Sequence, residues 1–204
     1  MICIEHVETY GWQMAVRGMR NPLNSWKKSD STFNEWVRTI GPNDLDLMHR
    51  LASAGSDHRK FMRMIMVAMD VTAPLYWWKE FDTYKVGTVA NSCSTMHTIH
   101  SKPFTLDDFS HDHLKPFAMD TLLKTIDCMN AYRERYLESK NKENWWQLIQ
   151  LLPTSYNQKR TVLLNYEVLR NIYHARRHHK LDEWHGFCDV VAALPHAELI
   201  TGEI

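Results

Sequence analysis

Glycine is scarce in this chain, and its scarcity excludes two common kinds of nucleotide site. Only seven of the 204 residues are glycine, and they form no Gly-rich loop of the kind that surrounds a phosphate. Rossmann and P-loop sites depend on such a loop, because glycine lets the backbone approach a phosphate closely. We therefore expect neither of these folds.

The chain also lacks net charge and long apolar runs. Lys and Arg number 24, as do Asp and Glu, so the formal net charge is zero. Nucleic acids and anionic membrane surfaces attract proteins largely through an excess of positive charge, and no apolar run approaches the ~20 residues that a membrane helix needs. We expect neither a nucleic acid nor a membrane as partner, so any anion must bind at a local site.

Cysteines are few and scattered. Cys3, Cys93, Cys128 and Cys188 form no CxxC pair, and the N-terminus lacks the charged and apolar regions of a secretory signal. This pattern predicts a reduced, cytoplasmic protein without structural disulfides. Cys93 fits either a nucleophile or a small buried thiol, and the buried thiol is the commoner role.

Histidine is abundant, with 12 residues, but its spacing forms no metal-binding motif. His174 and His178 lie four residues apart, as do Cys93 and His97, and neither pair has a third ligand or an HExxH pattern. We therefore expect no metal site.

Apolar periodicity predicts a helix-dominated α+β chain that forms a single domain over residues 1–204. The expected strands are 1–7, 61–71 and 160–164. The expected helices are 9–19, 43–54 with Asn43 as N-cap, 74–87 between Pro74 and Gly87, 117–137, 143–152, 166–176 and 182–194. The stretch 98–115 is an irregular connection of a length typical of lids.

Two separated segments, 73–95 and 152–184, contain polar residues that a plain core does not need. In the second, Asn165, Leu169, Ile172 and Arg176 are spaced four, three and four apart, so they share one helical face. An arginine at the end of an apolar stripe needs a partner. That partner is either an anionic ligand or a carboxylate such as Glu167 or Asp182.

These segments resemble the flavin-dependent thymidylate synthase family, whose members methylate deoxyuridylate with a reduced flavin and methylenetetrahydrofolate. Ala73-Pro74-Leu75-Tyr76 is similar to the family's helix start. Thr83-Tyr84-Lys85-Val86-Gly87-Thr88 and Asn91-Ser92-Cys93-Ser94-Thr95-Met96 stand where the family has Arg-His-Arg-x-small-Ser and Asn-Glu-x-Ser-x-Arg. Further similarities are Val16-Arg17-Gly18-Met19-Arg20, Leu152-Pro153, Asn165, Leu169, Asn171 and Arg176.

The signature is degenerate in this chain. Thr83 and Lys85 replace two arginines, Tyr84 replaces the histidine, Ser92 replaces the glutamate and Met96 replaces the last arginine. Lysine retains a charge but lacks the bidentate fork that suits phosphate.

The resemblance implies an α+β fold with a central, mainly antiparallel sheet and long flanking helices. It implies FAD as cofactor, NADPH and methylenetetrahydrofolate as co-substrates, and a pyrimidine nucleotide or related small anion as ligand. The implied cofactor-binding residues are Tyr84, Lys85, Thr88, Asn165 and Asn171. The implied substrate-binding residues are Ser92, Ser94 and Arg176, and Arg176 is also the catalytic residue.

The resemblance also implies a homotetramer, because family members build their sites between subunits. Trp77, Trp78, Trp145 and Trp146 are expected to supply exposed aromatic surface for such an assembly.

Two classes of function stay open. The chain is either a flavin-dependent enzyme of nucleotide metabolism or a non-catalytic or repurposed nucleotide- or flavin-binding protein of the same fold. Under the second interpretation, Tyr84 and Lys85 are surface residues at a helix end and the asparagines are ordinary helix caps.

Overall fold

The computed structural model describes residues 2–202 and divides them into two compact units. Unit 1 comprises residues 2–3, 71–83 and 91–161, and unit 2 comprises residues 4–70, 84–90 and 162–202. Met1, the first residue of the predicted N-terminal strand, lies outside the described residues. The single domain over 1–204 stays a prediction.

A four-stranded sheet has the order β1-β4-β6-β5. Its strands are β1 (Cys3–Tyr10), β4 (Met66–Pro74), β5 (Thr88–Ser92) and β6 (Asn157–Asn165). In β4, buried Val67, Met69, Val71 and Ala73 alternate with half-buried residues, as in a strand with one covered face. The predicted α+β class with an antiparallel sheet is confirmed.

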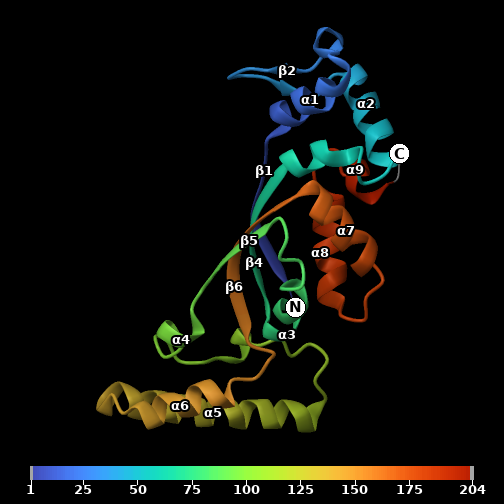
Figure 1. The fold of residues 1–204 in the computed structure, drawn as a ribbon. Coiled ribbons are helices and arrows are strands. Elements are labelled where there is room, and N and C mark those ends of the chain that lie inside the picture. Colours follow the sequence, from blue (N-terminus) through green and yellow to red (C-terminus); the bar gives the residue numbers. More distant parts are fainter. Residues whose placement is uncertain (1, 203–204) are drawn as a thin grey trace. The chain divides into compact units, whose positions relative to one another are not determined.

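Unit 2 holds the helices from both ends of the chain. They are α1 (Trp12–Arg20), α2 (Pro42–Ser53), α7 (Tyr166–Arg176), α8 (Asp182–Ala192) and α9 (Glu198–Thr201), with 3-10 turns η1 (Asn21–Leu23), η2 (Trp26–Lys28) and η3 (Arg59–Met64). A small antiparallel hairpin pairs β2 (Thr32–Phe33) with β3 (Arg38–Thr39). Helix α7 packs against α8, α9 and η3 (Figure 1). Its bounds are those predicted from the apolar spacing.

Unit 1 is built around a helical hairpin. Its elements are α3 (Leu75–Phe81), α4 (Thr95–Thr98), η4 (Leu106–Asp108), α5 (Pro116–Ser139) and α6 (Lys142–Leu151). Helices α5 and α6 lie side by side (Figure 1), joined only by Lys140 in a left-handed conformation and Asn141, whose side chain caps α6. The two helices contribute buried side chains to an apolar cluster, which they share with the segment before α5. Its members are Ile99, Phe104, Phe109, Leu122, Ile126, Met129 and Leu148.

Two predicted boundaries are clearly wrong, and one strand was not predicted. The helix expected to end at Gly87 ends at Phe81, where the Thr83 hydroxyl donates to the Glu80 carbonyl at 2.7 Å and the chain turns. Residues 61–64 lie in η3 rather than in a strand, and β4 begins only at Met66. Strand β5 was not predicted, because its residues are largely exposed and polar.

Helix α2 is capped from outside the helix. Its N-cap is Gly41 rather than Asn43, and the Asp30 carboxylate accepts hydrogen bonds from the N–H groups of Asn43 at 2.9 Å and Asp44 at 3.1 Å. A Cβ at Gly41 would lie 2.3 Å from Asp30 Cγ, so the capping carboxylate leaves room only for glycine.

The expected exposure of Trp77 and Trp78 is wrong. Both are fully buried and pack on Phe81, with ring centroids 5.1 and 5.2 Å from it, whereas Trp146 is exposed. Trp77 and Trp78 therefore contribute to a core and give no support to an oligomeric interface.

Membrane-spanning helices are absent from residues 2–202: no helix there combines the length and the hydrophobicity that crossing a bilayer requires.

Candidate functional site

Arg176, the last residue of α7, lies among aromatic groups of unit 2. Its Nε donates a hydrogen bond to the Tyr84 hydroxyl at 2.9 Å. The guanidinium carbon lies 5.0 Å from the centroid of the Trp184 ring and 5.6 Å from that of the Tyr84 ring, within the range of cation–π attraction. We call Tyr84, Arg176 and Trp184 the Arg176 cluster. It brings together two of the predicted site residues, and no motif in the sequence had indicated Trp184.

The carboxylates considered as partners of Arg176 have other contacts. The Glu167 carboxylate accepts from Arg63 Nε at 2.6 Å and from Arg59 Nε at 3.5 Å. The hydrogen bond between Arg63 and Glu167 raises the pKa of Arg63. Asp182 lies 3.6 Å from His185 Nδ1. The contacts of Arg176 include the Tyr84 hydroxyl and the ring of Trp184.

Asn165 and Gly87 meet at the start of α7. Asn165 Oδ1 accepts from the Val168 N–H at 3.0 Å, so this asparagine is the N-cap of the helix. Gly87 has a positive φ of 79°, and a Cβ there would lie 2.9 Å from Asn165 Nδ2 and 3.1 Å from Val168 Cγ2. Only glycine permits this close approach.

Thr88, next to Gly87, carries a polar atom without a partner. Its Oγ1 is buried and makes no hydrogen bond to any of the residues 2–202. A buried hydroxyl without a hydrogen bond is unfavourable, and in native proteins such groups usually meet a water or a ligand. The Thr88 hydroxyl is therefore a polar atom that the described residues leave unsatisfied.

The other predicted site residues have fewer contacts. Lys85 follows Tyr84 on the surface of unit 2, and Asn171 is exposed on α7. Ser92 and Ser94 belong to unit 1, where Ser92 is exposed at the end of β5 and Ser94 accepts from the His97 N–H at 3.1 Å as the N-cap of α4. Six of the eight predicted site residues thus belong to unit 2.

A cavity of about 460 Å³ lies within unit 1 beside Ser94 and Cys93. Lys102 on its wall contacts Asp108 at 2.5 Å, and that hydrogen bond raises the pKa of Lys102. Burial raises the pKa of Tyr156 on the same wall. Cys93 is exposed, so the expected burial of this thiol is wrong.

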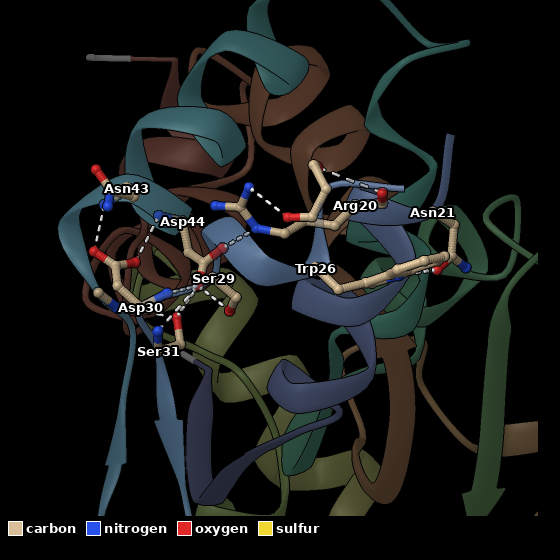
Figure 2. Close-up of polar contacts among 10 residues, drawn as sticks. Arg20, Asn21, Trp26, Ser29, Asp30, Ser31, Asn43 and Asp44 are labelled. Atoms are coloured by element: carbon tan, nitrogen blue, oxygen red, sulfur yellow. Dashed lines mark hydrogen bonds and ion pairs between the residues drawn. The ribbon is translucent and has the colours of Figure 1, made fainter. Parts of the chain in front are cut away.

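Arg20, the last arginine of the family-like segment near the N-terminus, has a structural partner. Its Nε donates to Asp44 Oδ1 at 2.6 Å, and both side chains are buried (Figure 2). Asp44 Oδ2 accepts from the hydroxyls of Ser29 at 2.7 Å and Ser31 at 2.6 Å. Burial, the largest influence, raises the pKa of Asp44, but the hydrogen bonds from Ser29, Ser31 and Arg20 together outweigh it and lower the pKa.

A second cavity, of about 710 Å³, lies within unit 2 and has Arg20 on its wall. Its apolar lining includes Met19, Leu23, Leu47, Leu51, Phe61 and Met64. Lys28, Arg50 and Lys60 add cations to the same lining, and Asp57 adds one carboxylate. An apolar recess with cationic groups suits a ligand that combines a ring with an anionic group.

Metal ligands do not gather anywhere in residues 2–202, where no group of three or more His, Cys, Asp or Glu side chains is placed to hold an ion.

No protein-family model matches the sequence, and no curated protein matches it by sequence comparison. The structure nevertheless has clear relatives among solved proteins. The fold is that of the flavin-dependent thymidylate synthases and of a related nucleotide methylase.

Two solved proteins illustrate the likeness. The flavin-dependent thymidylate synthase ThyX of Helicobacter pylori, complexed with FAD and dUMP, superimposes with a TM-score of 0.71 over 98% of this chain and 98% of its own, at 16% identity. The UMP/dUMP methylase PolB of Streptomyces cacaoi, bound with 5-Br UMP, gives a TM-score of 0.63 over 95% of this chain and 88% of its own, at 14% identity. At such identities the likeness establishes the fold, and the fold implied by the sequence motifs is confirmed.

Proposed function

We propose that this protein methylates a pyrimidine nucleotide, deoxyuridylate or a close relative, in a flavin-dependent reaction. The observation that carries the proposal is the contact between Tyr84 and Arg176, because both residues lie at positions of the family's motifs and are 92 residues apart in the sequence. Fold likeness over nearly the whole chain to proteins bound to FAD and dUMP, or to 5-Br UMP, supports the same reaction class.

FAD is the proposed cofactor, and three features of unit 2 fit it. The buried Thr88 hydroxyl lacks a partner, Lys85 offers an exposed cation, and Gly87 lets the backbone come close to Asn165. We assign Tyr84, Lys85, Thr88, Asn165 and Asn171 to cofactor binding. When bound, the flavin supplies the reducing equivalents, and the protein's groups bind and orient it.

The unit 2 cavity is a second place suited to part of the cofactor. FAD has two ring systems joined by a pyrophosphate, so it needs an apolar recess as well as cations or amide donors. The apolar lining of this cavity and its Lys28 and Lys60 meet both needs.

Arg176, Ser92 and Ser94 are the proposed nucleotide-binding residues, with Arg176 as the catalytic group. A guanidinium stabilises the negative charge of a phosphate or of a pyrimidine carbonyl oxygen as charge develops there. Two aromatic rings lie within cation–π range of the Arg176 guanidinium and favour one orientation of it. Arg176 therefore contributes by electrostatics and positioning.

The wider proposal includes NADPH and methylenetetrahydrofolate as co-substrates, a homotetramer and a cytoplasmic location. The cytoplasmic location is supported by the four cysteines, which are all free.

Sedimentation velocity at micromolar concentration measures the oligomeric state directly, and a clean monomer would exclude a site shared between subunits.

A second candidate is a protein of this fold that binds a nucleotide or flavin without methylating it. The observation that favours it is the loss of charge in the signature, where Thr83, Ser92 and Met96 stand in place of charged residues. Each lost ionic contact lowers nucleotide affinity by about tenfold or more.

Complementation of a thymidine-requiring bacterium that lacks its own synthase tests the reaction. Growth without thymidine supports the methylation, provided that the Arg176→Ala variant, expressed at the same level, does not support growth.

FAD titration of the purified protein separates the two candidates further. Flavin binding without growth favours the binding protein, and no flavin binding at millimolar FAD contradicts both flavin-based proposals.

A further inference from the structure

A further cavity, of about 420 Å³, lies at the closed end of the α5–α6 hairpin in unit 1. Its lining comes from α4 and the turn after it, from the end of α5 and from the start of α6, which lie near one another in Figure 1. It includes His97, His100, Tyr136, Lys140, Lys142 and Trp145, and Met96 completes the wall. We call this cavity the hairpin pocket. None of its residues is among those assigned above to FAD or to the nucleotide.

Basic side chains line the hairpin pocket, and no carboxylate does. Two lysines and two histidines belong to the lining, whereas the unit 2 cavity includes Asp57 and the other unit 1 cavity includes Asp107 and Asp108. Glu138 and Glu143, the carboxylates nearest to the lysines in the sequence, are exposed and lie outside the lining. Because a cavity lined by one sign of charge concentrates counter-ions, the hairpin pocket suits an anion.

Both lysines lie close to aromatic rings. Lys140 Nζ is 5.7 Å from the centroid of the Tyr136 ring, and Lys142 Nζ is 5.8 Å from that of the Trp146 ring, within cation–π range. Neither ammonium group forms an ion pair with any of the residues 2–202. The charges of Lys140 and Lys142 are therefore not compensated by a carboxylate of the described chain.

Lys140 also has an unusual backbone conformation. Its φ is 54°, in the left-handed region, at the position after α5 where glycine or asparagine is the usual residue. Residues other than glycine in sparsely populated backbone regions cluster at functional sites, where the side chain has a task that glycine cannot perform. At Lys140 that task is to supply a cation to the hairpin pocket.

An indole and an imidazole with unused hydrogen-bonding capacity complete the hairpin pocket. Trp145 is half-buried, and its ring packs edge to face on Trp146 with centroids 4.9 Å apart. The His100 ring packs edge to face on Tyr136, also at 4.9 Å. The side chain of His100 makes no hydrogen bond within residues 2–202, and its Nδ1 is buried. Such a nitrogen usually meets a water or a ligand in native proteins.

We propose that the hairpin pocket binds a phosphate group carried by a ligand that also contains a planar ring. The phosphate oxygens accept from Lys140, Lys142 and the imidazoles, and the ring stacks on Trp145. A phosphate presents three acceptor oxygens and up to two negative charges, so it can meet both ammonium groups at once. Two sources share this chemistry: the adenine and 2′-phosphate of NADPH, a co-substrate in the proposed function, and a phosphorylated aromatic molecule unrelated to it.

Phenyl phosphate is the first probe, and the indole N–H resonance of Trp145, assigned by its loss in Trp145→Phe, reports on the hairpin pocket alone. Phenyl phosphate should shift this resonance with saturation, and Lys142→Gln should weaken the affinity by about tenfold, the loss of one charge-assisted contact. The control is Lys124→Gln, because Lys124 is an exposed lysine of α5 that pairs with Asp120 at 2.7 Å and lies outside the lining. No response of the Trp145 resonance, or equal affinity in Lys142→Gln and wild type, would overturn the proposal.

Inorganic phosphate and phenol test the two halves of the ligand. Each should bind more weakly than phenyl phosphate, because each makes only part of its contacts. Inorganic phosphate that binds as tightly as phenyl phosphate would overturn the ring contact. Phenol that binds as tightly would overturn the phosphate contact.

NADPH and NADH, which differ only in the 2′-phosphate, distinguish the two sources. If NADPH is the ligand, it should shift the Trp145 resonance at concentrations at least about tenfold lower than NADH, and Lys142→Gln should remove this preference. Equal responses to NADPH and NADH, together with binding of phenyl phosphate, assign the pocket to an unrelated phosphorylated molecule. The pocket and the proposed function fail separately: a protein that binds no FAD can retain the Trp145 response, and a protein that supports growth without thymidine can lack it.

Discussion

Arg20 and Arg176, two arginines of unit 2, are held in opposite ways. Arg20 is buried, with 4% of its surface exposed, and is paired with a carboxylate that accepts further hydrogen bonds from Ser29 and Ser31. Arg176 is half-buried and contacts a phenol and an indole. Arg20 thus belongs to a buried ion pair, and the surroundings of Arg176 include two aromatic rings.

The difference distinguishes an arginine in a buried structural ion pair from the arginine to which we have assigned a ligand in the proposed function. A buried ion pair strongly resists the loss of either partner, because the remaining charge would be left desolvated. Aromatic rings attract a cation to their faces without burying it in an ion pair of this kind. Although both arginines lie in segments that resemble the same family, their surroundings assign them different tasks.

Asp44→Ala is expected to have the largest effect on stability. It leaves Arg20 buried without its countercharge, and removal of one partner from a buried pair costs about 3–5 kcal/mol. Urea denaturation followed by far-UV circular dichroism measures this loss. The control is Asp46→Ala, which removes an exposed carboxylate bound to Arg50 at 3.0 Å and should cost at most about 0.5 kcal/mol. Similar losses in the two variants would show that burial does not distinguish these pairs.

Arg176→Ala should show the opposite pattern from Asp44→Ala: a large loss of nucleotide affinity and a small loss of folding stability. We expect dUMP affinity to fall by about a hundredfold, or about 2.7 kcal/mol, and stability to fall by about 1 kcal/mol. Titration calorimetry and urea denaturation measure the two quantities. Arg177→Ala, the exposed neighbour on the same turn, is the control. Wild-type nucleotide affinity in Arg176→Ala would remove this residue from the site.

Lys85→Ala should weaken FAD binding by about tenfold, the loss of one charge-assisted contact. Lys27→Ala, another exposed lysine of unit 2, should leave FAD affinity unchanged. Quenching of flavin fluorescence on titration measures both. Equal affinities would mean that Lys85 is a plain surface residue.

Lowering the pH should weaken the Arg20–Asp44 pair gradually, and the loss of stability should be smaller than that in Asp44→Ala. Because the pKa of Asp44 is lowered in the folded protein, the ionised carboxylate favours folding. This contribution is fully present above the unfolded-state value of about 4 and is lost as pH falls through the folded-state pKa. Denaturation midpoints between pH 7 and pH 3 should fall more steeply in wild type than in Asp44→Asn, whose side chain does not titrate. Parallel curves would contradict this origin of the acid sensitivity.

Much of the helical structure was predictable because its signals are local. The apolar residues of α5 and α7 recur at three and four positions, and the bounds of α7 were predicted to the residue. Residues 61–64 misled the prediction because a short apolar run is compatible with a buried strand and with a buried turn, and only the tertiary context decides between them. The cap of α2 was missed because Asp30 lies outside the helix.

The candidate site was predictable only in part. The motif resemblance selected Tyr84 and Arg176, which are 92 residues apart and in contact. It gave no signal for Trp184, because a tryptophan in a helix usually belongs to a core and nothing local reveals which cation its ring meets. The separate network of Asp44 depends on a loop, residues 29–31, whose hydroxyls have no periodic pattern.

Asp30 and Asp44 each accept a hydrogen bond from the backbone N–H of the other, at 3.2 Å from Asp30 and 3.1 Å from Asp44. The amides in the first turn of a helix usually exchange their hydrogens with solvent quickly, because they have no partner within the helix. The carboxylate of Asp30 accepts from the amides of Asn43 and Asp44 in the first turn of α2. The carboxylate of Asp44 accepts from the amides of Asp30 and Ser31 in the preceding loop. These four amides should therefore share one opening free energy in deuterium exchange, because the opening that exposes them detaches the 29–31 loop and unwinds the start of the helix together.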